Sequence, residues 1–312
     1  MEVGEGAFAE HRELLFGVAY RVLGRVVDAE DVVQECWLRW AKVDPAEVGD
    51  ARAFLLTVVT RLSVDRLRRV RARRESYVGE WLPEPVPTIA GPDGLTDPAE
   101  YVVRAESVSL ALLVVLESLS PLERAVFVLR EVFAFGYPEI ARLLDRREAA
   151  VRQLAVRARA HVRERRPRFE VDPLVWRRLT DRFAAACLEG RIEGVMELLA
   201  PDVRLVADSG GNAVAPRRVI VGPEPVARFV LQVMRLRKPF LSSVGVDGDT
   251  QTVEYRLVEA NAGPALQVTA DGRPIVHFQL QVADGRVVAC HLVVNPEKLG
   301  AVMSQDGAVL RL

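Results

Sequence analysis

The sequence predicts a multidomain protein with two all-α helical domains, the second carrying a helix-turn-helix, followed by an α+β domain. Apolar residues recur with the helical period over residues 7–74 and 101–168. Five prolines interrupt that period between residues 75 and 99, as is typical of a linker. After residue 172, helical patterns give way to alternating strand-like runs, an order that indicates an α+β domain.

These boundaries divide the chain into four parts. We expect a first helical domain over residues 1–75, a linker over 76–104, a second helical domain over 105–168 and the α+β domain over 170–312. With 312 residues, of which 50% are hydrophobic, the chain is long enough to bury a core in each domain.

The first domain contains two helices with different surfaces. A helix over residues 28–43, with Asp28 as N-cap, places Val33, Trp37 and Ala41 on one stripe. A second stripe of this helix carries Asp31, Gln34, Glu35 and Leu38. The next helix begins with an apolar packing face and ends in arginines that point in almost every direction around its axis, which predicts contact with a polyanion. These arginines are Arg66, Arg68, Arg69, Arg71, Arg73 and Arg74.

The second domain ends in a pattern with helix-turn-helix spacing. Pro138 suits the first turn of a short helix, and Asp145 with Glu148 has the spacing of a capping box for the helix that follows. The inward residues of that following helix are predicted to be Val151, Leu154, Ala158 and Val162. The residues predicted to face outward are Arg152, Gln153, Arg157 and Arg159.

The third domain is predicted to begin with three helices, from Pro173 to near Gly190, over Ile192–Leu199 and from Pro223 to Arg237. Six strands are expected, with Asp-Gly turn signals at residues 247, 271 and 284. The strands are expected over residues 203–207, 240–246, 252–258, 265–270, 275–283 and 287–294.

Charge alternates along the first half of the chain although the whole chain carries a net charge of only −1. Lys plus Arg minus Asp plus Glu is −6 for residues 1–50, +7 for 51–74, −8 for 75–145 and +7 for 146–168. A patterned field of this kind attracts phosphate locally, so the two basic blocks indicate two DNA-contacting modules.

Other classes of protein lack support in the sequence. No apolar run approaches the length of about 18 residues that spans a bilayer, and the acidic N-terminus has no signal-peptide pattern, so we expect a cytoplasmic protein with no membrane contact. Cys36, Cys187 and Cys290 have no paired spacing, and the four histidines form no metal-binding motif. We therefore expect no metal and no cofactor.

Three motifs resemble the extracytoplasmic-function sigma factors of bacterial RNA polymerase, over residues 1–168. DAEDVVQECWLRW (28–40) resembles the region 2 helix that docks on core polymerase, and AFLLTVVTRLSVDRLRRVRARR (53–74) the helix that reads and opens the −10 element. LSPLERAVFVLREVFAFGYPEIARLLDRREAAVRQLAVRARAHV (119–162) resembles region 4, which binds the −35 element.

The resemblance implies three sets of contact residues. The residues that contact core polymerase would be Asp31, Gln34, Glu35 and Trp37. The residues near the melted −10 strand would be Arg61, Asp65, Arg68 and Arg69, because Arg pairs phosphates and stacks on unpaired bases. The residues at the −35 element would be Arg147, Arg152, Gln153, Arg157 and Arg159, where Arg suits guanine and Gln suits adenine.

Two further motifs, YVGEWLPEPV (77–86) and NPEKL (295–299), resemble the SigJ-type subgroup, which carries a fused C-terminal SnoaL-like cone domain. In that subgroup the extension is thought to regulate the sigma factor in place of a separate anti-sigma protein. The implied partners are core RNA polymerase, promoter DNA and an intramolecular contact between the C-terminal domain and the sigma domains. The implied regulatory residues are Trp81, Pro83, Glu84, Asp208, Asn295, Pro296, Glu297 and Lys298.

The alternative is a helix-turn-helix transcriptional regulator with an appended ligand sensor or cyclase- or isomerase-like enzyme. Such an enzyme would need an acid/base group in an apolar pocket, for which Asp208, Tyr255, His277 and His291 are the candidates. No pair among them has a spacing that dictates chemistry, so we expect no enzyme and leave an unknown small-molecule ligand open. A clamp-docking helix followed by a strand-opening helix favours the sigma factor, because a repressor needs neither.

Overall fold

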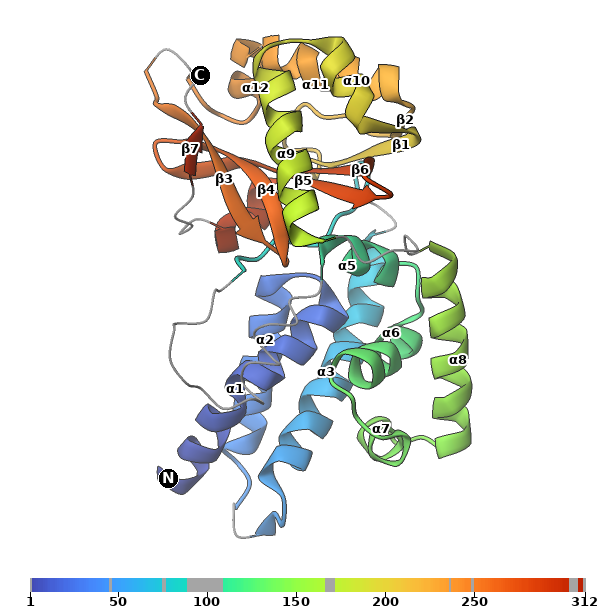
Figure 1. Cartoon of the computed structure of the whole chain (residues 1–312). Coiled ribbons are helices and arrows are strands. Elements are labelled where there is room, and N and C mark those ends of the chain that lie inside the picture. Colours follow the sequence, from blue (N-terminus) through green and yellow to red (C-terminus); the bar gives the residue numbers. More distant parts are fainter. Residues whose placement is uncertain are drawn as a thin grey trace. The chain divides into compact units, whose positions relative to one another are not determined.

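The computed structural model describes residues 2–44, 47–74, 77–88, 109–165, 172–235, 237–247, 250–302 and 308–310. The chain divides into two compact units (Figure 1). The helical unit comprises residues 1–75 and 89–166, and the sheet unit comprises residues 76–88 and 167–312. The first part of the expected linker, residues 77–88, thus belongs to the sheet unit, whereas residues 89–104 lie outside the described residues.

The helical unit begins with three packed helices. They are α1 (Glu2–Leu23), α2 (Val26–Trp40) and α3 (Ala51–Arg74). Its second part contains α5 (Leu110–Leu116), α6 (Pro121–Phe127), a π-helix η2 (Val128–Val132), α7 (Tyr137–Leu144) and α8 (Glu148–Arg165). A fully buried guanidinium joins the two parts, because Arg124 donates to the carbonyl of Arg21 at 3.0 Å and to Glu117 at 2.7 Å.

Two predicted helix caps are wrong. Helix α2 begins at Val26, so Asp28 lies inside it, where its buried carboxylate accepts from Arg66 at 2.7 Å. Helix α8 begins at Glu148, so this residue is too early to complete a capping box with Asp145. Asp145 instead ends α7 in the left-handed conformation, with φ of 53°. Asp28 pairs with an arginine that is distant in the sequence, and Asp145 takes a left-handed conformation at a helix end. The local sequence pattern reveals neither.

The sheet unit contains a seven-stranded mixed sheet in the order β2-β1-β6-β5-β4-β3-β7 (Figure 1). The strands are β1 (Leu199–Asp208), β2 (Ile220–Val221), β3 (Val253–Ala260), β4 (Gly263–Ala270), β5 (Arg273–Ala283), β6 (Arg286–Val293) and β7 (Ala308–Leu310). β1 and β6 are parallel, and the other pairs are antiparallel. Helices α9 (Pro173–Leu188), α10 (Ile192–Leu198), α11 (Pro223–Arg235) and α12 (Arg237–Ser243) complete the unit.

Five of the six predicted strands are present, and the turns at Asp271-Gly272 and Asp284-Gly285 have the positive φ angles of two-residue hairpin turns. The predicted strand over residues 240–246 is wrong, because this segment forms most of α12 and its end. Gly245, with φ of +77°, terminates the helix, and its amide and that of Val246 bind the carbonyls of Ser242 and Leu241. The apolar residues of this segment, which resemble a strand in the sequence, lie at the end of a helix.

The two faces of the sheet differ in chemistry. Alternate residues of β5, among them Phe278 and Leu280, join the apolar core formed with the four helices. The residues between them include His277 and Gln279, which are also buried, as is His291 on β6. Burial lowers the pKa of His277 and of His291 to about 4, so both side chains are neutral at pH 7.

This burial predicts a stability that depends on pH. In the unfolded chain the histidines bind protons below pH about 6.5, but in the fold they bind them only below about 4, so stability is lost as pH falls between these values. We expect a loss of roughly 2 kcal/mol per histidine by pH 5. Urea unfolding of the full chain at pH 5 to 7.5 measures it. The His277→Gln/His291→Gln variant should flatten this slope, whereas His161→Gln, at an exposed position on α8, should leave it unchanged.

Candidate functional site

The exposed face of α2 carries the first candidate surface. Asp31, Gln34 and Glu35 are exposed, as the sequence predicts, and Leu38 is 54% exposed beside them. Val27, also 54% exposed, extends the same stripe by one turn and was missed in the sequence because it precedes the predicted helix start. Trp37 is half-buried, and its ring lies 5.0 Å from that of Phe8 on α1. The stripe therefore combines acidic and apolar groups, which suits a protein partner better than DNA.

The arginines of α3 do not all face solvent. Arg66 binds Asp28 and Asp31, and these carboxylates raise its pKa. Arg71 donates to the carbonyl of Glu117 at 3.0 Å. Two of the arginines at this helix end therefore have partners within the protein, and contact of the helix end with a polyanion stays a prediction.

The four residues predicted to lie near the −10 strand separate into two groups. Asp65, Arg68 and Arg69 are exposed together, and Asp65 pairs with Arg68 at 2.9 Å. Arg61 instead binds the end of α7, donating to the carbonyl of Leu143 at 2.9 Å and to that of Arg142 at 3.3 Å. The helix-turn-helix thus occupies one arginine of the candidate −10 surface.

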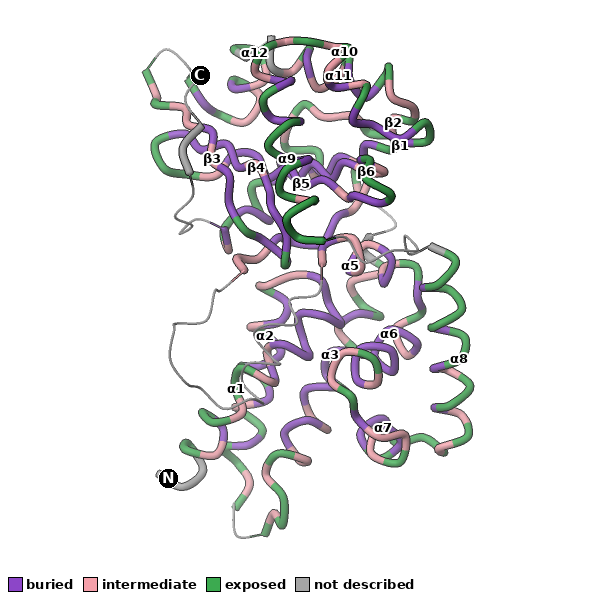
Figure 2. Tube along the Cα trace, viewed as in Figure 1, coloured by how far each residue is buried: buried purple, intermediate pink, exposed green. Residues whose placement is uncertain are grey.

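Helix α8 exposes the residues expected at the −35 element, as the tube in Figure 2 shows along its length. Two of its arginines are held in place by neighbours. Arg152 pairs with Glu148 at 2.5 Å and lies over the ring of Tyr137. Arg157 pairs with Glu123, whose carboxylate also completes a capping box with Ser120 at the start of α6. Burial alone would raise the pKa of Glu123, but its hydrogen bonds to Ser120 and Arg157 lower it.

The inward face of α8 differs slightly from the prediction. Val151, Ala158 and Val162 are buried as expected, whereas Leu154 is half-buried and Ala155 is buried. The residues of the predicted −35 set, Arg147, Arg152, Gln153, Arg157 and Arg159, are all exposed. Their side chains are therefore accessible to a duplex.

In the sheet unit, a buried ion pair holds the linker. The Asp208 carboxylate, at the end of β1, accepts from the Lys298 ammonium at 2.6 Å, and both side chains are fully buried. Leu82 of the linker supplies both of its peptide groups to this pair. Its amide donates to Asp208 at 2.8 Å, and its carbonyl accepts from Lys298 at 2.6 Å. One residue of linker backbone thereby satisfies a cation and an anion at once.

Two aromatic side chains of the linker complete the same site. The Tyr77 hydroxyl donates to Asp208 at 2.5 Å and accepts from the Asn295 amide at 2.9 Å. The Trp81 ring lies 3.1 Å from the Lys298 ammonium, in a cation–π contact. The Asn295 side chain also caps the short helix η3 (Pro296–Lys298), which carries the lysine. We call Tyr77, Trp81, Leu82, Asp208, Asn295 and Lys298 the linker clamp.

The loop after Asp208 allows the Tyr77 and Asn295 side chains to approach its backbone closely. Gly210 has φ of +58°, and a Cβ at this position would lie 2.5 Å from the Asn295 amide nitrogen and 3.1 Å from the Tyr77 hydroxyl. Neither the conformation nor the space suits another residue. The absence of a side chain at Gly210 therefore leaves room for the Tyr77 hydroxyl and the Asn295 amide.

The rest of the described linker continues as an extended chain against the hairpin of β3 and β4. Val86 and Asn261 exchange hydrogen bonds of 3.0 Å, and the Thr88 amide donates to the carbonyl of Glu259 at 2.9 Å. Pro83, Pro85 and Pro87 have no amide hydrogen to satisfy and favour an extended backbone before docking. These three prolines therefore reduce the conformational entropy that the linker loses when it binds.

The other residues predicted to be regulatory have different positions. Pro83 and Glu84 are buried, whereas Pro296 and Glu297 are exposed and contribute through the backbone turn. Asn212, which follows the Asp208 loop, is exposed and takes no part in the ion pair, whose cation is Lys298. Sequence reasoning missed Tyr77 and Asn261. Tyr77 stands just before the proline-rich segment and was a visible signal, whereas Asn261 lies 175 positions from Val86 and only the fold brings it to the linker.

Among the described residues no group of three His, Cys, Asp or Glu could hold a metal ion. The three cysteines are buried and unpaired. Among the helices of the described ranges, none is long and apolar enough to cross a lipid bilayer.

The clamp predicts a strong effect of one substitution. Asp208→Ala leaves the Lys298 ammonium buried without its counter-ion, which costs about 3–5 kcal/mol of stability. Asp208→Ala/Lys298→Met, which removes both charges, should recover much of that loss. Asp202→Ala, at an exposed position of the same strand, is the matched control and should change little. Urea unfolding of each full-length variant measures the difference, and equal stability of the single and double variants would contradict the ion pair.

Comparisons with known proteins identify the family of the chain. Residues 7–74 match the family model for sigma-70 region 2, and residues 109–162 match that for sigma-70 region 4. The ECF RNA polymerase sigma factor SigJ of Mycobacterium tuberculosis is 41% identical over 96% of this chain and 93% of its own length. The probable ECF RNA polymerase sigma factor SigI of the same species is 30% identical over 96% of each chain.

A crystal structure of M. tuberculosis SigJ covers 96% of this chain and 98% of its own, with a TM-score of 0.71 and 35% identity. The similarity extends through the sheet unit, so it includes the C-terminal domain as well as the two sigma regions. The alternative of a self-sufficient DNA-binding regulator is thereby set aside. The chain belongs to the extracytoplasmic-function sigma factors, which direct RNA polymerase to promoters.

Proposed function

We propose that this sigma factor binds core polymerase through the α2 stripe, the −10 element through α3 and the −35 element through α8, and that its C-terminal domain restrains initiation by holding the linker. The observation that carries the regulatory part is the clamp. A buried Asp208–Lys298 pair whose remaining hydrogen bonds go to Leu82 is complete only when the linker is docked.

In the helical unit, an arginine of the candidate −10 surface contacts the helix-turn-helix that carries the candidate −35 surface. Arg61 of the candidate −10 surface lies 2.9 Å from the Leu143 carbonyl, and four residues further along the chain Arg147 begins the candidate −35 surface. Four residues span at most about 15 Å. The two promoter elements lie roughly 25 base pairs apart, about 85 Å along the duplex at 3.4 Å per step. Both surfaces cannot reach their elements while Arg61 binds α7, so initiation requires this contact to open.

Opening depends on the segment between the two helical parts, and the sheet unit holds residues 77–88 of that segment. Two residues, 75 and 76, connect the end of α3 to the docked segment 77–88. Chain that is docked cannot contribute its conformational freedom to the separation of the two DNA-binding parts. Release of the linker therefore favours the open state, and docking favours the closed one.

We assign the C-terminal domain a binding role in place of a catalytic one. The Asp208 carboxylate accepts hydrogen bonds from three donors of the clamp. His277 and His291 lie on strand positions that alternate with the apolar core residues and are held neutral by burial. Tyr255 faces a pocket on the apolar side, and no Asp, Glu or His among the described residues lines that pocket. Acid–base chemistry needs such a pair within reach of one substrate.

The −35 assignment predicts different behaviour for two arginines of α8. Arg152→Ala should weaken some promoters more than others, by about 1–3 kcal/mol, because it removes a base contact. Arg163→Ala, at another exposed position, should weaken all promoters alike and reduce the slope of log affinity against log salt by about 1, because it removes a phosphate contact. Binding of the holoenzyme to a panel of −35 variants at several salt concentrations measures both. Equal profiles for the two variants would contradict the assignment of α8 faces.

The regulatory role predicts a gain of activity from a small change. Tyr77→Phe removes one donor to Asp208 and one acceptor from Asn295 while keeping the ring, so the linker should dock less firmly. We expect several-fold more specific transcript from core polymerase and a cognate promoter, together with faster proteolysis within the linker. Tyr255→Phe makes the same chemical change away from the clamp and should alter neither.

Two outcomes would overturn parts of this proposal. Faster proteolysis with unchanged transcription would show that the clamp holds the linker without regulating initiation. Removal of Asp31 and Glu35 by Asp31→Ala/Glu35→Ala tests the polymerase surface separately. Undiminished capture of core polymerase by that variant would contradict the role of α2.

A further inference from the structure

Arg152 on α8 is held by two neighbouring side chains. Its guanidinium lies over the ring of Tyr137, the first residue of α7, with 4.6 Å between Cζ and the ring centre. Its Nε and Nη2 atoms both donate to Oε1 of Glu148, one turn earlier on α8, at 2.9 and 2.5 Å. The Arg152 side chain is nevertheless 58% exposed. It therefore has a defined orientation and remains accessible to a ligand.

The ring of Tyr137 is itself held in place. A second guanidinium, that of Arg130, lies over the same ring at 4.8 Å and donates to the Phe135 carbonyl at 2.9 Å. The Tyr137 hydroxyl accepts a hydrogen bond from Arg159 at 3.3 Å. An aromatic face attracts cations, and the flat guanidinium of arginine also stacks on it. Tyr137 therefore supports Arg152 from a position that other contacts determine.

The hydrogen bonds of Arg152 leave one edge of its guanidinium for a ligand. Nε and Nη2 form the edge along the side chain, and Glu148 occupies that edge. The edge at the tip is formed by Nη1 and the second hydrogen of Nη2. Among the described residues, none of the hydrogen bonds of Arg152 uses Nη1. Two parallel N–H groups on such an edge match a pair of neighbouring acceptors.

Guanine is the base that matches this edge. In the major groove guanine presents two neighbouring acceptors, O6 and N7, whereas adenine presents N7 beside the N6 donor. Cytosine presents a donor, and thymine presents one acceptor beside a methyl group. Because arginine carries donors only, each of these three bases leaves at least one N–H of the edge unmatched. The orientation of Arg152 therefore favours guanine over the other bases.

We infer that Tyr137 and Glu148 are positioning residues that fix Arg152 as the reader of one guanine in the −35 element. The inference rests on the proposed contact of α8 with that element and deepens it. The negative charge of Glu148 repels DNA phosphate, so this residue lowers the affinity of α8 for any sequence while it orients Arg152. Glu148 thus increases discrimination between sequences and decreases overall affinity.

The test measures binding of the holoenzyme, formed from core polymerase and the full-length chain, to a promoter selected from a library with a randomised −35 element. Each guanine of the selected element is replaced in turn by adenine and by 7-deazaguanine, which lacks the N7 acceptor. For the wild-type chain we expect one guanine at which adenine weakens binding about tenfold or more. With Arg152→Ala, replacement of that same guanine should change the Kd less than about twofold.

Glu148→Ala distinguishes a positioning role from a purely structural one, which would weaken binding to all sequences. We expect tighter binding to all sequences, because a negative charge is removed, together with loss of most of the preference for guanine. Glu164→Ala removes an exposed carboxylate from the same helix and should leave that preference unchanged.

Substitutions of Tyr137 test the support from the ring. Tyr137→Leu should lose most of the preference for guanine, whereas Tyr137→Phe keeps the ring and should retain the preference within about twofold. Should Tyr137→Leu not fold, as judged by circular dichroism, Glu148→Ala still tests the inference, because the Glu148 side chain is 41% exposed.

The outcomes separate this inference from the proposed function. A preference that Arg152→Ala abolishes but that a folded Tyr137→Leu or Glu148→Ala variant retains would overturn the positioning role of the residue concerned. A base other than guanine at the position coupled to Arg152 would overturn the assignment of the free edge. Base preferences that Arg152→Ala leaves unchanged at every position would contradict the −35 surface of α8, and the inference with it.

Discussion

The buried ion pair between Asp208 and Lys298 is the interaction on which docking of the linker depends. Two charges removed from water cost several kcal/mol each in desolvation, and their mutual attraction compensates only when their remaining hydrogen-bonding positions are filled. The peptide groups of Leu82 fill one position on each charge, and the Tyr77 hydroxyl fills another on the carboxylate. The linker is consequently part of the domain's own charge balance, so its docking and the domain's stability are one coupled equilibrium.

The helical unit follows the same physical rule with arginine. Arg61, Arg71 and Arg124 each donate to backbone carbonyls of the other helical part. Carbonyl groups at helix ends have no partner within their own helix and offer partial negative charge. DNA phosphate offers a full negative charge, so in the function that we propose it would compete for the guanidinium group of Arg61. An arginine-rich helix can therefore close against protein in one state and open toward DNA in another without changing its sequence.

The sequence predicts well what depends on periodicity and poorly what depends on tertiary pairing. The exposed faces of α2 and α8 and five of six strands follow from alternation of apolar residues. The start of α2 does not, because Asp28 pairs with Arg66, which lies 38 positions along the chain. The strand predicted at 240–246 fails because Gly245 ends a helix there. Family resemblance identified Asp208 and Lys298, but only the fold shows that Leu82 joins them.

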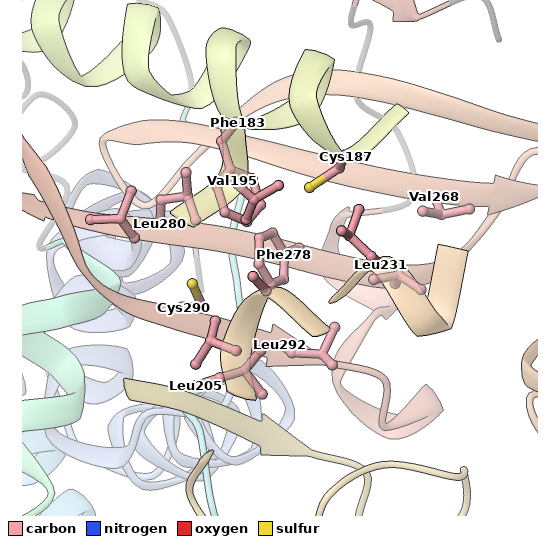
Figure 3. Packing of buried hydrophobic residues seen from close by; sticks show 14 of the residues in the cluster. Phe183, Cys187, Val195, Leu205, Leu231, Val268, Phe278, Leu280, Cys290 and Leu292 are labelled. Carbon is pink, nitrogen blue, oxygen red and sulfur yellow. The ribbon is translucent and has the colours of Figure 1, made fainter. Parts of the chain in front are cut away.

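The sheet brings the two chemistries of the C-terminal domain onto the same strands. β1 contributes Leu205 and Ala207 to the apolar core and then Asp208 to the clamp, and β6 contributes Leu292 to the same core (Figure 3) three residues before Asn295. Packed cores resist continuous deformation, so a change of packing at Leu292 must shift the strand end or be absorbed elsewhere. Because β1 and β6 pair in parallel from Arg204 to Asp208, their ends lie side by side. The clamp is thus built at the point where two neighbouring strands of the apolar core end.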